Sequence, residues 1–175
     1  VAANIKRLPL ISIDNQHFLT ETKVDYPKNH EKDVALAKAV IKLMVFNTKA
    51  NLVISFFKAK TKNKKTFVFS PIVRQEVLTT KPQTKDHILV YVTSANPELE
   101  NTLKKVKQKF ICYGFGKKGK ENNLTFKLPN QKQFFDDLAT CRAVVANAGF
   151  TLIGEALYLG KPYLAWPVKS QFEQT

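Results

Sequence analysis

The second half of the chain alternates short apolar runs with stretches that have helical spacing. Near-continuous apolar runs predict five strands, at residues 87–92, 110–113, 124–128, 143–146 and 163–168. The stretches between them predict helices at 97–107, from Asn130 or Gln131 onward, and at 151–159. Such an alternation predicts an α/β fold with a doubly wound parallel sheet. Ligands of such sheets bind beyond the carboxyl ends of the strands.

The first half of the chain predicts fewer elements. Residues 8–13 predict a strand that is followed by the polar loop 14–17. Asp33 can cap a helix whose apolar residues recur at helical spacing, and we expect that helix to be largely buried: Val34, Leu36, Ala37, Val40, Ile41, Leu43 and Met44. Two further strand-like runs, 52–57 and 66–69, are joined by a lysine-rich loop, which we interpret as a solvated hairpin loop.

The apolar pattern lapses after residue 70, and this lapse predicts the domain organisation. We expect residues 71–86 to form a linker between the last part of one domain, 1–70, and a second domain, 87–175. The chain begins with Val1 rather than Met, and no signal segment opens it, so either its start has been removed or it is a piece of something longer. No window approaches the ~18 uninterrupted apolar residues of a transmembrane helix.

The charge is unusual: 28 basic against 14 acidic residues give +14, and only Arg7, Arg74 and Arg142 are arginines. This surplus predicts attraction to an anionic partner. Sequence-specific DNA readers depend on arginine, so nucleic acid is disfavoured, whereas lysines suit phosphates or an anionic membrane surface. The candidate patch is the set Lys58, Lys60, Lys62, Lys64 and Lys65. A merely solvated loop remains the alternative.

Cys112 and Cys141 lie in apolar stretches and have no CxxC partner, which predicts buried free thiols and a reducing compartment. The run 114–119 matches GxGxxG, but it leads into a predicted strand instead of a helix, so it does not predict a dinucleotide site. The histidines are far apart in the sequence. We therefore expect no metal site and no cofactor.

The most informative segment is 144–155, where a strand ends in small residues and a helix begins at once. Backbone N–H groups from Gly149 to Thr151 would face the ligand crevice and form an anion site. Glu155, about one turn into the helix, could accept hydrogen bonds from paired hydroxyls. The alternative stays open: Gly149 could be only a turn and Glu155 a solvated helix residue.

Gly149 to Glu155, Gly160-x-Pro162, Pro167 and the pair Glu173-Gln174 resemble the donor-binding signature of GT-B glycosyltransferases. The closest likeness is to the C-terminal domain of glycosyltransferase family 28, which includes the N-acetylglucosaminyltransferase of lipid-linked peptidoglycan precursor synthesis. Two features depart from related plant and glucuronosyl enzymes. Asn147 replaces a histidine, and the loop between Pro167 and Glu173 is about two residues longer.

The resemblance implies two Rossmann-like domains, of which the first is present only in part, and a set of donor contacts. Glu155 would hold the ribose, and Gly149, Phe150 and Thr151 would receive the diphosphate close to Asn147. Glu173 and Gln174 would bind the sugar. Phe126 and Leu128, in the loop 126–130, would lie against the base. The loop 93–96 would occupy the place of a phosphate loop.

The resemblance also implies the reaction. The parent protein would transfer a sugar from a nucleoside diphosphate sugar, in particular a UDP sugar, to a lipid-linked or polysaccharide acceptor in cell-envelope glycan synthesis. The transfer would be inverting and metal-independent, at the cytoplasmic face of the membrane. The catalytic base is unknown, with His17 and Asp14 as weak candidates, and we expect residues 1–175 alone to be inactive. Alternatives are a UDP-sugar 2-epimerase of the same fold and a nonenzymatic basic module that binds nucleic acid.

Overall fold

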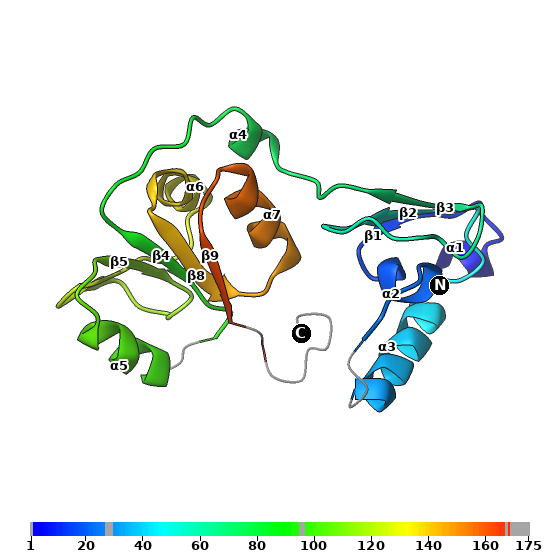
Figure 1. Cartoon of the computed structure of the whole chain (residues 1–175), viewed down its shortest axis with the longest axis horizontal. Helices are drawn as coiled ribbons and strands as arrows, with labels where there is room; N and C mark the ends of the chain where they lie inside the picture. Colours follow the sequence, from blue (N-terminus) through cyan, green and yellow to red (C-terminus); the bar gives the residue numbers. More distant parts are fainter. Residues whose placement is uncertain (1, 27–29, 95–96, 167, 169–175) are drawn as a thin grey trace. The chain divides into compact units, whose positions relative to one another are not determined.

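The computed structural model describes residues 2–26, 30–94, 97–166 and 168, which fall into two units (Figure 1). The first unit is Val1–Ile72 and the second is Val73–Thr175. None of the helices in the described ranges combines the length and the apolar character needed to cross a bilayer.

The first unit is built on three parallel strands in the order β1-β2-β3: Ile11–Asp14, Ala50–Ile54 and Thr66–Phe69. A short helix, α1 (Ala2–Ile5), precedes the sheet, and α2 (His17–Glu21) and α3 (Glu31–Met44) lie on one side of it (Figure 1). Because β2 and β3 are parallel, the expected hairpin was wrong. The connection 55–65 instead returns the chain past α2, where Thr61 bridges Thr22.

Burial in the first unit is unusual, because the covered face of the sheet is largely polar. Ser12, Asn51 and Thr66 are buried there together with Val53. The other face carries exposed apolar side chains, which are Ile11, Ile13, Phe67 and Phe69. The expectation that α3 is largely buried was also wrong. Only Val34 and Ile41 of that helix are buried, while Leu36, Val40, Leu43 and Met44 are exposed.

The second unit contains a six-stranded sheet in the order β6-β7-β5-β4-β8-β9. Its strands are β4 (Ile88–Tyr91), β5 (Phe110–Tyr113), β6 (Gly119–Glu121), β7 (Leu124–Phe126), β8 (Ala143–Asn147) and β9 (Tyr163–Trp166). All neighbours are parallel except β6, which pairs antiparallel with β7. The helices are α4 (Gln75–Leu78), α5 (Pro97–Lys105), α6 (Gln131–Thr140) and α7 (Phe150–Tyr158). The predicted α/β class and parallel sheet are confirmed.

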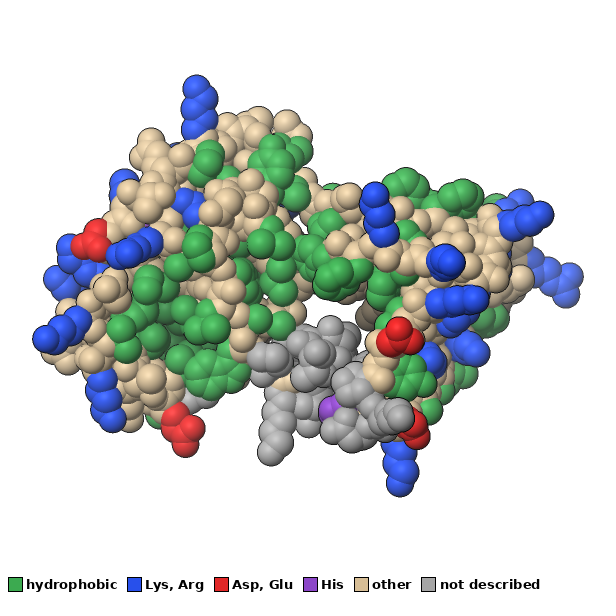
Figure 2. Space-filling model, in the orientation of Figure 1, with side chains coloured by type: hydrophobic (Ala, Val, Ile, Leu, Met, Phe, Trp, Pro, Cys, Tyr) green, Lys and Arg blue, Asp and Glu red, His purple; other side chains and the backbone are tan. Residues whose placement is uncertain are grey.

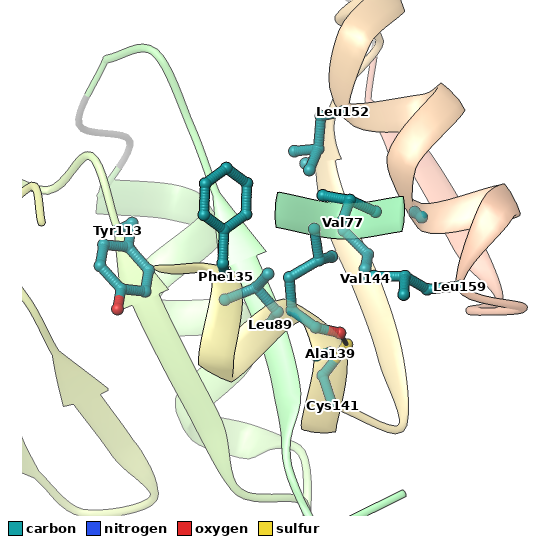
Figure 3. Packing of buried hydrophobic residues seen from close by; sticks show 12 residues of the cluster. Val77, Leu89, Tyr113, Phe135, Ala139, Cys141, Val144, Leu152 and Leu159 are labelled. Atoms are coloured by element: carbon teal, nitrogen blue, oxygen red, sulfur yellow. Dashed lines mark hydrogen bonds between the residues drawn. The ribbon is translucent and has the colours of Figure 1, made fainter. Parts of the chain in front are cut away.

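Two apolar clusters cover opposite faces of this sheet, as expected from strands that read as continuous apolar runs. Leu89 belongs to one cluster, with residues of α4, α6 and α7, and its neighbour Val90 belongs to the other, with residues of α5. Figure 3 shows Val77 of α4 packed near Leu89 and Val144 in the first of these clusters. Helices therefore cover both faces of the sheet, and the packed core between the helices and the sheet holds the strands in place.

The segment 71–86, expected to be a linker, is largely part of the second unit. The unit boundary falls at residues 72 and 73, and Val77 is buried in the core. The N–H of Gln83 donates to the carbonyl of Ala139 (3.0 Å). The buried Lys161 donates from Nζ to the carbonyls of Gln83 and Cys141, the latter at 2.9 Å. A single buried apolar side chain and isolated hydrogen bonds leave no periodic pattern of apolar residues in the sequence.

The glycine run 114–119 has a structural explanation. Gly119 begins strand β6, so the run does not open a helix. Gly114 has φ +89°, and a Cβ added to it would lie 1.7 Å from the carbonyl oxygen of Val92. A glycine is therefore required there by the close approach of two backbone segments.

Candidate functional site

The candidate site of the second unit lies where strands β4 and β8 are neighbours in the sheet. The chain leaves β4 toward α5 and β5 on one side, and leaves β8 toward α7 and β9 on the other. This is the point at which the winding direction changes, and the crevice at such a point is the usual ligand site of open α/β sheets. Thr93, in the loop after β4, and Asn147, the last residue of β8, meet there.

Hydrogen bonds of Asn147 connect the carboxyl ends of three strands, β4, β8 and β9. Its Oδ1 accepts hydrogen bonds from the backbone N–H (2.8 Å) and the hydroxyl (3.2 Å) of Thr93. Its Nδ2 donates to the carbonyl of Trp166 (3.1 Å), and its own carbonyl accepts from the hydroxyl of Tyr163 (2.6 Å). Asn147 was predicted as a donor-binding residue. Its side chain is engaged in these hydrogen bonds, which connect the three strand ends.

Helix α7 begins directly beyond the carboxyl end of β8. Its N-cap is Gly149, in an extended conformation and without a side-chain cap. The first intrahelical bond runs from the N–H of Ile153 to the carbonyl of Gly149 (3.1 Å). Helix geometry thus gives the N–H groups of Thr151 and Leu152 no acceptor within the helix. These donors and the positive end of the helix dipole form a place for an anion.

Glu155 occupies a different environment from the one expected. Its side chain is 0% exposed, and both carboxylate oxygens accept hydrogen bonds from Arg74, with Nη2 2.6 Å from Oε2. The guanidinium of Arg74 also lies over the ring of Phe135, 4.4 Å from its centroid. Glu155 is therefore not open to a ribose in this conformation, and it is not a solvated helix residue either.

Arg74 is the residue of this site that the sequence did not predict. The hydrogen bond from its guanidinium to Glu155 raises the pKa of Arg74. Its side chain stays 43% exposed, so it joins a buried carboxylate to the surface. A lone arginine inside a stretch without apolar periodicity gave no signal. Only the rarity of arginine in a lysine-rich chain could have drawn attention to it.

The other residues predicted to contact the donor differ in their exposure, and some of them are not described by the structure. Phe126 is 2% exposed and packs edge-on against Phe115 in the core, which does not support a contact with a base, whereas Leu128 is exposed. The pair Glu173-Gln174 lies outside the described residues, as does the end of the loop 93–96.

In the first unit, Asp14 and His17 form a hydrogen-bonded pair. Oδ2 of Asp14 lies 2.7 Å from Nδ1 of the buried His17, and Oδ1 accepts from the His17 backbone N–H (2.8 Å). The hydroxyl of Ser12 donates to the same carboxylate. Burial alone would raise the pKa of Asp14, but the hydrogen bonds from Ser12 and His17 outweigh it and lower that pKa. The pair orients the imidazole through Nδ1.

The five lysines of the predicted patch divide into two groups. The ammonium groups of Lys62 and Lys65 donate to the carbonyls of Thr20 (2.7 Å) and Thr48 (2.9 Å), which ties the loop down. Lys58, Lys60 and Lys64 are exposed and form no ion pair with the described residues. Figure 2 shows lysine and arginine side chains projecting from both units, with far fewer acidic groups on the same face.

Comparison with one solved structure agrees with this fold. A structure of Arabidopsis thaliana UGT89C1 in complex with UDP-L-rhamnose matches with a TM-score of 0.54 and 14% identity. The match covers 94% of this chain and 49% of that one. The glycosyltransferase SnogD from Streptomyces nogalater matches with a TM-score of 0.44 and 14% identity, over 79% of this chain and 45% of that one. The chain thus spans about half the length of both structures.

A search of curated proteins gave no match. A family model described as glycosyl transferase family 1 matches residues 1–175. The sequence-based assignment to the GT-B glycosyltransferases is confirmed at that level, while the closer likeness to family 28 stays a prediction. Because the family model covers the whole chain, the chain belongs to glycosyl transferase family 1 and has the GT-B fold.

Proposed function

We propose that the protein to which this chain belongs transfers a sugar from a UDP sugar to a lipid-linked or polysaccharide acceptor of the cell envelope. The observation that carries the donor half of this proposal is the uncapped N-terminus of α7 at the β4–β8 switch point. Thr151 and Leu152 present backbone donors there, next to the hydrogen-bonded Asn147 and Thr93. The UDP-L-rhamnose in the UGT89C1 structure supports a UDP sugar as the donor.

The helix terminus also suggests how the leaving group would be stabilised. Negative charge develops on the departing diphosphate, and backbone N–H groups with a helix dipole can stabilise it without a metal ion. We therefore propose a metal-independent transfer. In this arrangement Gly149 lets the backbone approach the diphosphate closely, because it has no side chain at the mouth of the site.

His17 is the proposed base on the acceptor side. With Nδ1 protonated, the ring would donate to Asp14, and Nε2 would accept the proton of an acceptor hydroxyl once the buried ring is exposed to it. A deprotonated hydroxyl attacking opposite the diphosphate would invert the anomeric carbon. The basic surface of the chain supports a location at the cytoplasmic face of an anionic membrane.

The donor proposal is tested by thermal unfolding of the chain with nucleotides. UDP at millimolar concentration should raise the melting temperature by mass action, and more than GDP or TDP does. If all three leave the melting temperature of a folded sample unchanged, the α7 terminus is not a nucleotide site. Assays for sugar transfer and for epimer formation, with UDP sugars, then separate a transferase from an epimerase.

A further inference from the structure

The first unit contains an open cavity that the proposed donor site does not use. Its volume is about 520 Å³, and it lies between the segments that follow α2 and β2. The residues that matter for its chemistry are Phe18, Lys23, Asp25, Phe57, Lys58 and Lys60. The segment with Phe57 and Lys58 leaves the carboxyl end of β2, and α2, which carries Phe18, follows the carboxyl end of β1. The carboxyl ends of parallel strands form the edge where α/β sheets bind ligands.

The walls of this cavity are held by backbone hydrogen bonds. The N–H of Lys23 donates to the carbonyl of Lys60 (2.9 Å), and the N–H of Lys62 donates to the carbonyl of Glu21 (2.8 Å). The side chains of Lys62 and Asn63 add bonds to the carbonyl of Thr20 and to the carboxylate of Glu21, both within 2.7 Å. The backbone of the lysine-rich loop is thus fastened to α2.

The lining carries a net positive charge. Lys23, Lys58 and Lys60 line the cavity together with one carboxylate, that of Asp25. Among the described residues, none accepts a hydrogen bond or forms an ion pair with the ammonium groups of these three lysines, in contrast to Lys62 and Lys65. Three ammonium groups around one cavity form a site for a phosphate-class anion.

The cavity also has apolar walls. Phe57 is 71% exposed, and it stands directly before Lys58 in the sequence, while the half-buried Phe18 lines the same cavity. A bare anion would use the lysines and leave these rings in water. A ligand with an apolar group beside its anion would cover the rings as well, so the lining fits an amphipathic phosphate better than inorganic phosphate.

We propose that this cavity binds a phosphate ester that carries an apolar group, with Lys58 and Lys60 contacting the phosphate and Phe57 the apolar part. The same chemistry is found in a free aryl or alkyl phosphate and in the headgroup region of an anionic lipid. The inference does not depend on the donor proposal, because it concerns residues of the first unit alone.

The test is calorimetric titration of the chain with 1-naphthyl phosphate, inorganic phosphate and 1-naphthol. We expect 1-naphthyl phosphate to bind about tenfold or more tightly than either of the others. The double variant Lys58→Gln, Lys60→Gln should weaken it at least about tenfold, since charge-assisted hydrogen bonds are lost. Phe57→Ala should weaken 1-naphthyl phosphate but leave inorganic phosphate unchanged. Circular dichroism confirms that each variant is folded.

The charge-matched control is Lys118→Gln, Lys120→Gln, two exposed lysines of the second unit, and its affinity should stay within about twofold of the parent. Saturating UDP should leave 1-naphthyl phosphate binding intact. Complete competition by UDP, or equal weakening in both double variants, would place the ligand elsewhere and overturn the proposal. Sedimentation with phosphatidylglycerol and phosphatidylcholine vesicles distinguishes an anionic lipid headgroup from a free phosphate ester. If the chain binds only phosphatidylglycerol vesicles, and Lys58→Gln, Lys60→Gln abolishes that binding, the phosphate is a lipid headgroup. If the chain binds neither 1-naphthyl phosphate nor phosphatidylglycerol vesicles, the proposal fails.

Discussion

Arg74 and Glu155, 81 residues apart in the sequence, are joined by two hydrogen bonds between the guanidinium and the carboxylate. The pair fastens the residue that precedes α4 to the buried face of α7. For Glu155 to meet a ribose hydroxyl, Arg74 would have to move away or share the carboxylate. Donor binding would then involve Arg74, near the N-terminal end of the second unit, as well as Glu155 on α7.

Removing Arg74 should destabilise the second unit, because an ionised carboxylate would remain buried without a partner. We expect Arg74→Ala to lower the free energy of unfolding by about 2 kcal/mol. This is less than the ~3–5 kcal/mol typical of a fully buried pair, since the arginine side chain is 43% exposed. Urea unfolding followed by circular dichroism measures the change.

The double variant Arg74→Met, Glu155→Leu is the control for this prediction, because it removes both charges. It should recover most of the lost stability. If Arg74→Ala is as stable as the parent chain, the pair contributes nothing and Glu155 is accessible to solvent or to a ligand.

Gly149→Ala should separate nucleotide binding from folding. Gly149 has φ −76°, and a Cβ there meets no atom within 4 Å, so the fold accommodates alanine. Stability should change by less than about 1 kcal/mol, because alanine restricts the unfolded chain but is a poorer N-cap than glycine. A diphosphate that approaches this backbone closely would meet the new methyl group, so the dissociation constant of UDP should rise about tenfold. Unaltered UDP affinity would show that no ligand approaches Gly149.

Asp14→Asn should reveal a pH-dependent contribution to the stability of the first unit. The pKa of Asp14 is lowered in the folded chain, so its contribution is present above the unfolded pKa, ~3.9, and is lost as the pH falls through the folded pKa. We expect the variant to be about 1 kcal/mol less stable at pH 7, with the difference shrinking below about pH 4. Unfolding titrations between pH 3 and 7 measure it. A difference that stays constant from pH 7 down to pH 3 would contradict this prediction.

Both thiols should be inert in the folded chain. Burial raises the pKa of Cys112 to about 12, and it raises the pKa of Cys141 as well. The thiolate is the reactive form, so iodoacetamide at pH 8 should label the native chain on the order of a hundred times more slowly than free cysteine. Mass spectrometry counts the labels before and after guanidinium unfolding. Rapid native labelling of one residue would contradict its buried placement.

The parts of the fold that the sequence predicted are those with a local signal. Continuous apolar runs marked the strands of the second unit, and α6 begins at Gln131, one of the two expected starts. Asn130 is its N-cap and accepts from the N–H of Gln133 at 2.9 Å. Strand β6 was missed, because Gly119–Glu121 has only three residues and no apolar character. It is formed through its pairing with β7, which no local pattern encodes.

The site was predicted less completely than the fold. The small-residue turn at Gly149 could be read directly, since a strand and a helix meet there. The partners of Asn147 and Glu155 could not, because Thr93, Trp166 and Arg74 come from elements distant in the sequence. In the first unit, the alternation of polar and apolar residues did not reveal which face of β1–β3 would be covered.

The polar packing beneath the sheet of the first unit bears on its calorimetry. Heat capacity rises on unfolding mainly because apolar groups become hydrated, and exposure of polar groups lowers it. Ser12, Asn51 and Thr66 come out of a covered face, while Ile11, Ile13 and Phe67 are already hydrated in the native state. The first unit should therefore melt with a smaller heat-capacity step per residue than the second, and the curve of its stability against temperature should be the flatter of the two.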